Sequence, residues 1–507
     1  MNGRPPAPAP ESLPSGYPHF LYFPPGAPGT GLGDVDVRHD GTSFHLFHLV
    51  QQSHHAIAHA VSRDGFTWET VEPALGLGRR GRFDDDMLWT MRVMRNPQNG
   101  SYHMYYTGCS AREHGRVQRV GLAVSEDLMT WRRWSEDPIL EAGPPHYLSD
   151  LNRVGLVPFR DPFVFVDDDG GWHMLVTARE PLESRFRSAC IAHATSSDGL
   201  HWDLQEPLYR NPDFEDMEVP FAVKAGGYWH LMFNTLGLAC TKVRRARTLA
   251  GPWLHPLGPE LLPEGNSIAG CCEVEGRHLL FHIIPSACDW PRRDLFAQPF
   301  KWVLSPPKVF VADDALGPRV VSYDGWERFA SGRIDLSREL PRGGPGWQAG
   351  PDGDVFCNTD VPVHALTRRS FSDFLFEGVL AASQAGNVRI HFRCDDAWED
   401  GYAAECDFVS GIVRFLKFRS HDSDLHRYKL ECPRVLQSAA LTLTGCGPLA
   451  VRLIAAGDYL EFSVGGAVRL SVSTYFRREG IFGFSVDQGN AAWTDLRMEE
   501  LTVPYRS

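Results

Sequence analysis

The sequence predicts an all-β protein in which a five-bladed β-propeller is followed by a C-terminal β-sandwich. Two observations carry this prediction: a turn-and-strand repeat in the first two thirds of the chain, and short alternating strands in the last third. The composition agrees, because 30 Phe, 14 Trp, 14 Tyr, 48 Gly and 37 Pro are typical of many short strands joined by tight turns.

The repeat consists of a turn, a short spacer, a histidine and an apolar run. It occurs five times, and its histidines, 48 to 70 residues apart, are His45, His103, His173, His230 and His278. This spacing suits one four-stranded sheet for each repeat. Because the histidine recurs at one place in every repeat, we expect a structural role with hydrogen bonds between blades rather than a ligand role.

A second signature, Ser-x-Asp followed by a short turn and a tryptophan, comes after each of the first three repeats. Its tryptophans are Trp68, Trp131 and Trp202, and a degenerate copy ends at Trp253. The Ser-x-Asp segment predicts a turn. We expect each tryptophan to pack between neighbouring blades.

The predicted propeller spans residues 17–325, after a flexible, Pro-rich N-terminus at residues 1–16. The predicted sandwich spans residues 335–507, where the segments 387–392, 460–464 and 481–486 alternate as half-buried strands do. A Pro/Gly-rich stretch at residues 340–346 indicates a linker or a surface loop.

The innermost strands of a propeller line one axial channel, so residues at equivalent positions converge on one pocket. Counting back eleven or twelve residues from each repeat histidine leads to Asp34, Met91, Asp161, Glu218 and Asn266. Carboxylates are costly to cluster in a pocket that gives them no task. Three converging acids suit glycosyl transfer, with a nucleophile or base, an acid, and a third acid that holds sugar hydroxyls or the partner of the nucleophile.

Four short segments look like motifs of one enzyme family. They are Phe-Arg-Asp-Pro at 159–162, Glu-Val-Pro at 218–220, Gly-Asp-Val at 33–35 and Leu-Trp-Thr at 88–90. These resemble the Phe-Arg-Asp-Pro, Glu-Cys-Pro, Asn-Asp-Pro and Trp-Ser/Thr-Gly segments of glycoside hydrolase family 32, the invertase, levanase and inulinase family. The chain is identified as a divergent member, and the resemblance covers nearly its whole length, because that family also carries a C-terminal β-sandwich.

The resemblance implies a β-fructofuranosidase-like glycosidase that cleaves terminal fructofuranosyl linkages of a small fructoside or fructan fragment with retention of configuration. Asp34 would attack the anomeric carbon, and Glu218 would protonate the leaving oxygen and then deprotonate water. Asp161, with Arg160 beside it, would bind two ring hydroxyls and stabilise the transition state. Blade one is a residue short between acid and histidine, so Asp36 is a rival nucleophile, although we prefer Asp34.

The remaining pocket candidates precede or flank these motifs. Trp89, Asp36, Asp86 and Asn266 join Arg160 as expected substrate-binding residues, and Glu215 and Asp216 are further candidates beside Glu218. For the run of acids at residues 84–86 the preferred interpretation is a solvated loop. Three consecutive acids lack the alternating spacing of a Ca²⁺ loop, so we expect no metal and no cofactor.

Three other functions stay open. One is an inverting arabinofuranosidase or xylosidase of the glycoside hydrolase family 43 kind, which uses a similar set of acids. The others are transfer of the fructosyl unit to another sugar, and a propeller that binds carbohydrate without cleaving it.

Charge and cysteine content restrict the partners. A net charge of −13 argues against binding to nucleic acid. The 11 cysteines contain no Cys-x-x-Cys pair, which argues against a disulfide framework or a zinc site. No apolar run approaches the length of about 18 residues that a membrane span needs. We therefore expect a cytoplasmic protein that acts on a small carbohydrate without a membrane, and a homodimer stays open.

Overall fold

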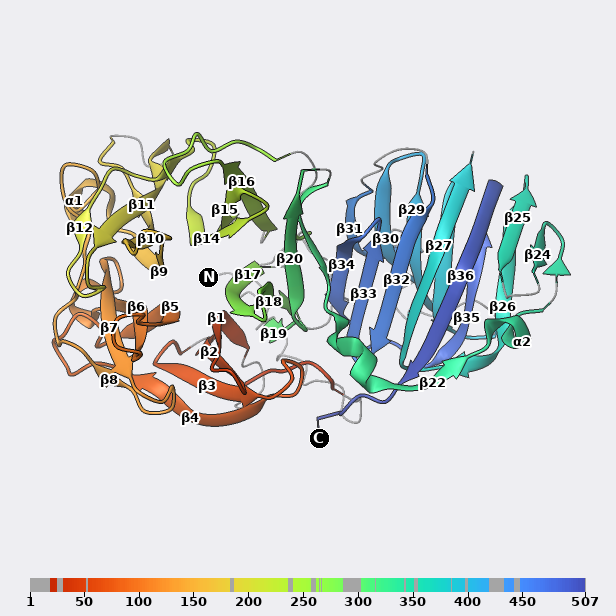
Figure 1. Cartoon of the computed structure of the whole chain (residues 1–507), viewed down its shortest axis with the longest axis horizontal. Helices are drawn as coiled ribbons and strands as arrows, with labels where there is room; N and C mark the ends of the chain where they lie inside the picture. The colour runs from red at the N-terminus through yellow and green to blue at the C-terminus, as the bar shows by residue number, and fades with distance from the viewer. Residues whose placement is uncertain are drawn as a thin grey trace, which may run out of the picture.

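The computed structural model of the chain is nearly all β-strand (Figure 1). It describes residues 19–24, 31–51, 53–182, 187–235, 240–256, 261–263, 265, 267–285, 302–314, 316–341, 343–350, 354–383, 385–396, 400–418, 433–441 and 447–506. Within these ranges the helical segments are η1 (Ala111–Glu113), α1 (Leu151–Val154), η4 (Asp324–Phe329) and α2 (Leu336–Glu339). The predicted all-β class is confirmed, and none of the helices described is long and apolar enough to cross a membrane.

Five antiparallel sheets fill the described part of residues 32–322. The first contains β1 (Leu32–His39), β2 (Phe44–Val50), β3 (Ala56–Ser62) and β4 (Glu69–Gly76). The second contains β5 (Met87–Arg95), β6 (Tyr102–Cys109), β7 (Gln118–Ser125) and β8 (Arg132–Arg133). The third contains β9 (Phe159–Val166), β10 (Trp172–Arg179), β11 (Ala189–Ser196), β12 (Asp203–Leu204) and β13 (Tyr209–Arg210).

The fourth and fifth sheets follow the same hairpin order. The fourth contains β14 (Met217–Ala225), β15 (Tyr228–Thr235) and β16 (Cys240–Ala246). The fifth contains β17 (Ser267–Val274), β18 (Arg277–Pro285), β19 (Trp302–Leu304), β20 (Lys308–Asp313) and β21 (Gly317–Ser322). The first strands of the sheets lie toward the middle of this half of the molecule (Figure 1), where β1 contacts β5 and β17, and β9 contacts β5 and β14.

The Ser-x-Asp signature forms the same turn in three sheets. In the first copy, the Oδ1 atom of Asp64 accepts hydrogen bonds from the amides of Phe66 and Thr67, at 2.8 and 2.7 Å. Asp127 and Asp198 accept the equivalent bonds in the second and third copies. The predicted turn is therefore confirmed, and the aspartate side chain caps it.

The tryptophan that follows each of these turns packs on a neighbouring sheet, as expected. Trp131 meets Phe47 of the first sheet with ring centroids 5.6 Å apart. Trp202 meets Tyr105 of the second sheet at 5.9 Å. Trp68 of the first sheet meets Phe281 of the fifth at 6.1 Å, so the first and last sheets also pack together.

His45, His103, His173 and His230 hydrogen-bond within their own sheets, so the expected bonds between blades are wrong for these four repeat histidines. Nδ1 of His45 lies 3.1 Å from Nε2 of His59, and Nδ1 of His173 lies 2.9 Å from Nε2 of His193. In both pairs the partner sits diagonally across the adjacent strand, two residues from the directly opposite position. Diagonal neighbours on one face of a sheet are within reach of long side chains, which explains the outcome.

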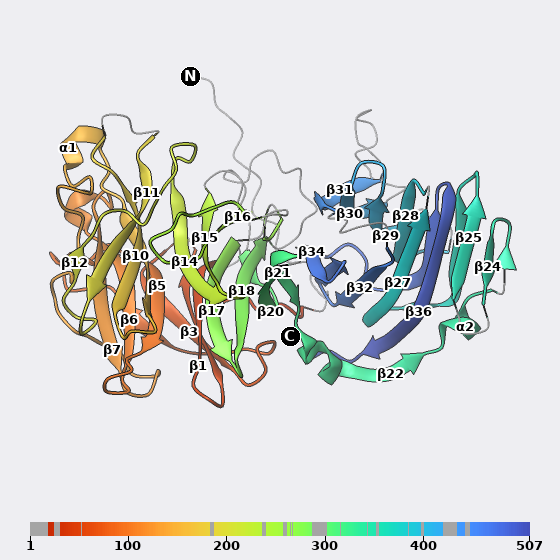
Figure 2. The same cartoon turned by 45° about the horizontal axis from the view of Figure 1, so that its top comes forward.

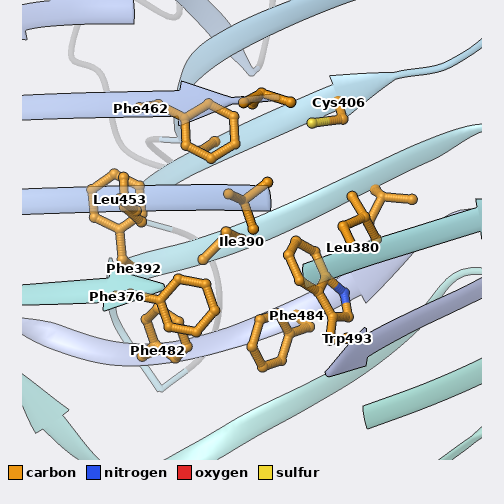
Figure 3. Packing of buried hydrophobic residues seen from close by; sticks show 14 of the residues in the cluster. Phe376, Leu380, Ile390, Phe392, Cys406, Leu453, Phe462, Phe482, Phe484 and Trp493 are labelled. Atoms are coloured by element: carbon orange, nitrogen blue, oxygen red, sulfur yellow. The ribbon is translucent and has the colours of Figure 1, made fainter. Parts of the chain in front are cut away.

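Two further sheets share one apolar core in the last third of the chain (Figure 3). One contains β22 (Ala330–Ile334), β23 (Gly343–Gly344), β24 (Trp347–Ala349), β25 (Val355–Thr359), β27 (Phe374–Ser383), β32 (Leu449–Ala456), β33 (Tyr459–Val464), β34 (Ala467–Ser473) and β36 (Gly489–Leu501). The other contains β26 (Val363–Phe371), β28 (Asn387–Cys394), β29 (Gly401–Asp407), β30 (Ile412–Phe418), β31 (Arg434–Ala440) and β35 (Gly480–Val486). The strands predicted at 387–392, 460–464 and 481–486 are confirmed as β28, β33 and β35.

The Pro/Gly-rich stretch is not a linker in its described part. Leu340 is buried in the core, and Gly343 and Gly344 form β23, which pairs with β24. Trp347 in β24 is buried in the same core and anchors this hairpin. The glycines therefore form a strand of the sheet instead of a spacer between domains.

The fifth sheet packs directly against the C-terminal sheets, with β21 beside β34 (Figure 2). At this junction the ammonium group of Lys308 on β20 lies 2.8 Å from a carboxylate oxygen of Glu461 on β33. Both side chains are buried, and the hydroxyl of Tyr459 contacts both of them. The ring of Trp326 stacks on Tyr459 with centroids 5.8 Å apart.

Candidate active site

The first strands of all five sheets carry a break in strand pairing at nearly the same depth. The break lies opposite the position three or four residues after the repeat histidine. Asp34 in β1, Thr90 in β5, Asp161 in β9 and Val219 in β14 are among the unpaired residues. Asp161 and Val219 have positive φ angles of 60° and 49°. Because such bulges re-aim side chains, they turn Asp34, Asp161 and the adjacent Glu218 out of the sheet pattern.

Asp161 is held by hydrogen bonds with residues of three sheets, one donated by its amide and two accepted by its carboxylate. Its amide donates to the hydroxyl of Thr107 at 3.0 Å, and its Oδ2 atom lies 3.0 Å from the hydroxyl of Thr177. The amide of Val219 donates to the same Oδ2 atom at 3.1 Å. The carboxylate is 4% exposed and is therefore fixed in one orientation before any ligand arrives.

Arg160 connects the acids of β9 and β14. Its Nη2 atom donates to Oε1 of Glu218 at 2.7 Å and to Oδ2 of Asp216 at 3.1 Å. Its Nε atom lies 3.5 Å from Oδ2 of Asp161. Burial opposes the charge on this guanidinium, but Asp161, Glu218 and Asp216 outweigh it and raise the pKa of Arg160 above its usual value.

Asp34 faces the same group of charges. Thr90 donates a hydrogen bond from its hydroxyl to Oδ2 of Asp34. Burial raises the pKa of Asp34 to about 7, and the negative charges of Asp161 and Glu218 act in the same direction. The hydrogen bond from Thr90 and the charge of Arg160 lower the pKa and offset only part of this shift.

Glu218 is partly open to solvent, with 28% of its side chain exposed. Burial still raises its pKa; Arg160 opposes the shift, while Asp161 and Asp216 support it. Asp34 and Glu218 therefore titrate as interacting groups, and the pocket retains a proton at a higher pH than isolated carboxyls would.

Asp36, the rival of Asp34, lies two residues further along β1 and has different partners. Its Oδ1 atom accepts a hydrogen bond from Arg92 at 2.9 Å, and its Oδ2 atom accepts one from the amide of Val93 at 2.7 Å. Burial raises the pKa of Asp36, and the charge of Arg92 opposes that shift. Both oxygens of this carboxylate are thus engaged with β5.

A cavity lies where the first strands meet. Its walls come from all five of them, through Asp36 of β1, Thr90 of β5, Asp161 of β9, Val219 of β14 and Gly270 of β17. A Cβ atom on Gly270 would lie 3.1 Å from the Cα atom of Asp36, so a glycine lets β17 approach β1 closely. The cavity therefore adjoins three of the bulges that carry or flank site residues, at Thr90, Asp161 and Val219.

Two of the other predicted substrate-binding residues lie near this cluster, and one is not described. Trp89 precedes Thr90 on β5, is half-buried and packs edge-on against His54 at 6.3 Å. Asp86 is half-buried at the start of β5, and its charge, after burial, raises the pKa of the Cys109 thiol. Asn266 lies outside the described residues.

The other acids of the 84–86 run hold a turn together. Asp84 is buried, and its Oδ2 atom accepts hydrogen bonds from Tyr106 and Arg133, each at 2.8 Å. Asp85 accepts hydrogen bonds from the amides of Gly81 and Ala111. The interpretation as a solvated loop is therefore wrong for Asp84, which is a paired interior group.

Sequence reasoning missed the residues that hold the acids, and one of its positions was off by one. Counting from the histidine led to Met91, whereas the unpaired residue is Thr90, because the lengths of hairpin loops and bulges vary between repeats. Thr107 and Thr177 each stand four residues after their repeat histidine, so the repeat itself contained a signal for them. No sequence pattern pointed to Arg92 or Arg179 as residues that support the site.

No group of His, Cys, Asp and Glu side chains among the described residues has the arrangement of a metal site.

These features define an all-β protein with a carboxylate-lined pocket where five sheets meet. The same fold occurs in fructan 1-exohydrolase IIa from Cichorium intybus, with a TM-score of 0.68, 13% identity and coverage of 97% of this chain and 99% of that one. It also occurs in exo-inulinase from Aspergillus awamori, with a TM-score of 0.69, 14% identity and coverage of 96% and 98%.

Residues 37–242 match the model of the N-terminal domain of glycosyl hydrolases family 32, which supports the assignment of the chain to that family. A levanase from Bacillus sp. (strain L7) is 27% identical over 239 residues, which are 44% of this chain and 24% of the levanase. An insoluble isoenzyme of beta-fructofuranosidase from Arabidopsis thaliana is 28% identical over 167 residues, which are 31% of this chain and 26% of that protein. The matched regions thus span only about a quarter of each relative.

Proposed function

We propose that this protein is a β-fructofuranosidase-like glycosidase that removes terminal fructofuranosyl units from a small fructoside or fructan fragment with retention of configuration. The observation that carries the proposal is the set of three acids, Asp34, Asp161 and Glu218, which sit at equivalent bulges and act on one another electrostatically. The match to the family model and the names of the levanase and fructofuranosidase relatives support the substrate class.

In the proposed mechanism Asp34 attacks the anomeric carbon while Glu218 gives its proton to the leaving oxygen. A covalent fructosyl-enzyme forms, and Glu218 then takes a proton from the water that hydrolyses it. Asp161, fixed by its three hydrogen bonds, accepts hydrogen bonds from two ring hydroxyls and stabilises the oxocarbenium-like transition state.

The choice of Asp34 over Asp36 rests on their partners. Asp36 neutralises Arg92 and accepts the amide of Val93, so attack on a sugar would require it to leave both. The negative charges of Asp161 and Glu218, in contrast, act on Asp34 and help to raise its pKa. Trp89, Asp86 and Asn266 remain proposed contacts of the substrate.

The first test is a panel of fructosides, arabinofuranosides and xylosides given to the protein and to single variants. We expect turnover of a fructoside, loss of detectable turnover in Asp34→Asn, and a kcat about 10²–10⁴ times lower in Glu218→Gln. Asp36→Asn should retain more activity than Asp34→Asn. Asp84→Asn is the matched control, because this buried carboxylate pairs with Arg133 instead of a site residue.

The second test follows the anomer released during turnover by NMR. Net retention supports the double displacement, whereas net inversion would assign the protein to the arabinofuranosidase and xylosidase kind of mechanism. Fructosylated products from an added acceptor sugar would indicate transfer. Sugar binding by the unmodified protein without turnover of any glycoside would leave only a carbohydrate-binding role.

We also propose that the five sheets are the five blades of a propeller at residues 17–325, followed by a sandwich at residues 335–507. The packing of the first sheet on the fifth supports a closed ring. The cysteines Cys109, Cys190, Cys271, Cys272, Cys357, Cys394 and Cys406 are free and buried, which supports the proposed cytoplasmic location. Cell fractionation and sedimentation of the purified protein test the location and the open question of a dimer.

A further inference from the structure

Asp216 is a buried acid that the proposed mechanism does not use, although it touches the same guanidinium as the proposed acid/base. It lies two residues before Glu218, in the segment that leads into β14. Nη2 of Arg160 donates to Glu218 at 2.7 Å and to Asp216 at 3.1 Å. On its other side, Asp216 accepts a hydrogen bond from Nη2 of Arg179 at 2.8 Å.

The charges around Arg160 explain why a second arginine is present. The carboxylates of Asp161, Asp216 and Glu218 all lie within 3.5 Å of a nitrogen of Arg160. One cation cannot neutralise three anions, two of them buried, and an unpaired buried carboxylate is costly. Arg179, of which only 2% of the side chain is exposed, supplies a second positive charge on the far side of Asp216.

The geometry of Arg160 decides how strongly it holds Glu218. A guanidinium can bind a carboxylate through two parallel hydrogen bonds, and such a bidentate pair strongly favours the ionised acid. Here Asp216 engages the same nitrogen that reaches Glu218, while Nη1 points to Oε1 of Gln118 at 3.4 Å. Among the described residues, Arg160 therefore reaches Glu218 through a single nitrogen.

We propose that Asp216, held in place by Arg179, is a positioning residue. It limits Arg160 to a contact with Glu218 through one nitrogen, so that Glu218 can carry the proton that the reaction needs. The inference rests on the proposed function and deepens it. Asp216 also contributes to the raised pKa of Glu218, after burial and the opposed effects of Arg160 and Asp161.

The test compares the pH dependence of kcat/KM for the unmodified protein, Asp216→Asn and Asp84→Asn. Loss of the Asp216 charge frees Arg160 for Glu218, so Glu218 ionises more easily and the basic limb of the profile moves to lower pH. We expect a shift of about one pH unit, the effect of a single nearby charge. Asp84→Asn removes an equally buried, arginine-paired carboxylate of the second sheet and should leave the limb in place.

A second variant covers the case in which Asp216→Asn leaves Arg179 unpaired and fails to fold. Asp216→Asn combined with Arg179→Gln removes both charges together, and we expect the same displaced limb. A limb that coincides with that of the unmodified protein in either folded variant overturns the proposal. If neither variant folds while Asp84→Asn does, the pair is only structural and the proposal is also wrong.

Infrared pH-difference spectroscopy separates this inference from the proposed function, because it needs no turnover. The band of the protonated Glu218 carboxyl, assigned by its loss in Glu218→Gln, should disappear at lower pH in Asp216→Asn than in the unmodified protein. Absence of turnover on every glycoside would overturn the glycosidase proposal alone. An unmoved band would overturn the role of Asp216 alone.

Discussion

Arg92 of the second sheet donates a hydrogen bond to Asp36 of the first sheet over 2.9 Å, with only 11% and 2% of the two side chains exposed. The same nitrogen donates to the carbonyl of Cys271 in the fifth sheet at 3.0 Å. The guanidinium also lies 4.5 Å from the ring centroid of Phe163 in the third sheet. The side chain of Arg92 thus links the first strands of four sheets, which are β5, β1, β17 and β9.

Loss of that link should destabilise the fold more than loss of a surface ion pair. We expect Arg92→Met to lower the free energy of unfolding by about 3–5 kcal/mol, because Asp36 keeps a buried charge without its partner. Arg277→Met, which removes an exposed pair with Asp324, should cost no more than about 1 kcal/mol. Urea unfolding followed by fluorescence measures both values.

The combined change Arg92→Met with Asp36→Asn distinguishes charge from packing. Because no uncompensated carboxylate remains, the double variant should be more stable than Arg92→Met alone. Equal stability of the two variants would mean that the contacts of Arg92 with Cys271 and Phe163, and not its charge, provide the stabilisation.

Thr90 should determine at which pH the acidic limb of the kcat/KM profile lies. Its hydroxyl stabilises the ionised form of Asp34, so Thr90→Val raises the pKa of Asp34, and a nucleophile that must be ionised then works only at higher pH. We expect kcat/KM at pH 5.5 to fall about threefold to tenfold while the value at the optimum changes less. Thr90→Ser keeps the hydroxyl and should keep the profile; an unchanged limb in Thr90→Val would contradict the assignment.

Asp34 should also make stability depend on pH. Its pKa is about 7 in the folded protein against 3.8 for the free side chain, so the folded state binds this proton more tightly. The stabilisation is fully present below pH 3.8 and is lost as the pH rises through 7. The substitution Asp34→Asn removes this titrating group. The Tm of the variant should therefore rise relative to the Tm of the unmodified protein as the pH increases from 5 to 8.

Differential scanning fluorimetry at the two pH values measures this effect. We expect the difference in Tm between Asp34→Asn and the unmodified protein to be larger at pH 8 by at least about 1–2 °C, because about 1 kcal/mol shifts the Tm of a cooperative unit of this size less than that of a smaller domain. The same difference at both pH values would show that burial does not raise the pKa of Asp34.

The sequence was most informative where a pattern recurs. Five copies of one turn and one histidine were enough to predict the strand positions, and the Ser-x-Asp turns predicted the packing of Trp131 and Trp202 on neighbouring sheets. The positions of Asp161 and Glu218 followed from the same register. What recurs reflects constraints that every sheet shares, and these are local enough to be seen in a single chain.

The support of the site was not visible in the same way. Arg160, Asp216 and Arg179 form one hydrogen-bonded chain, yet they come from β9, the segment before β14 and the end of β10. Such long-range pairing has no fixed spacing, because it depends on how far each bulge turns a side chain. Asn266 and the ends of several loops lie outside the described residues, so their predicted roles stay predictions.

The buried pair of Lys308 and Glu461 has a consequence for the chain as a folding unit. Each charge lies on a different side of the junction, so removal of either half would leave the other half with an unpaired charge and with its junction side chains open to water. The halves should therefore melt in one cooperative calorimetric transition, and neither should be exchangeable for an unrelated module by recombination. In this sense the C-terminal sheets and the five N-terminal sheets form one thermodynamic unit.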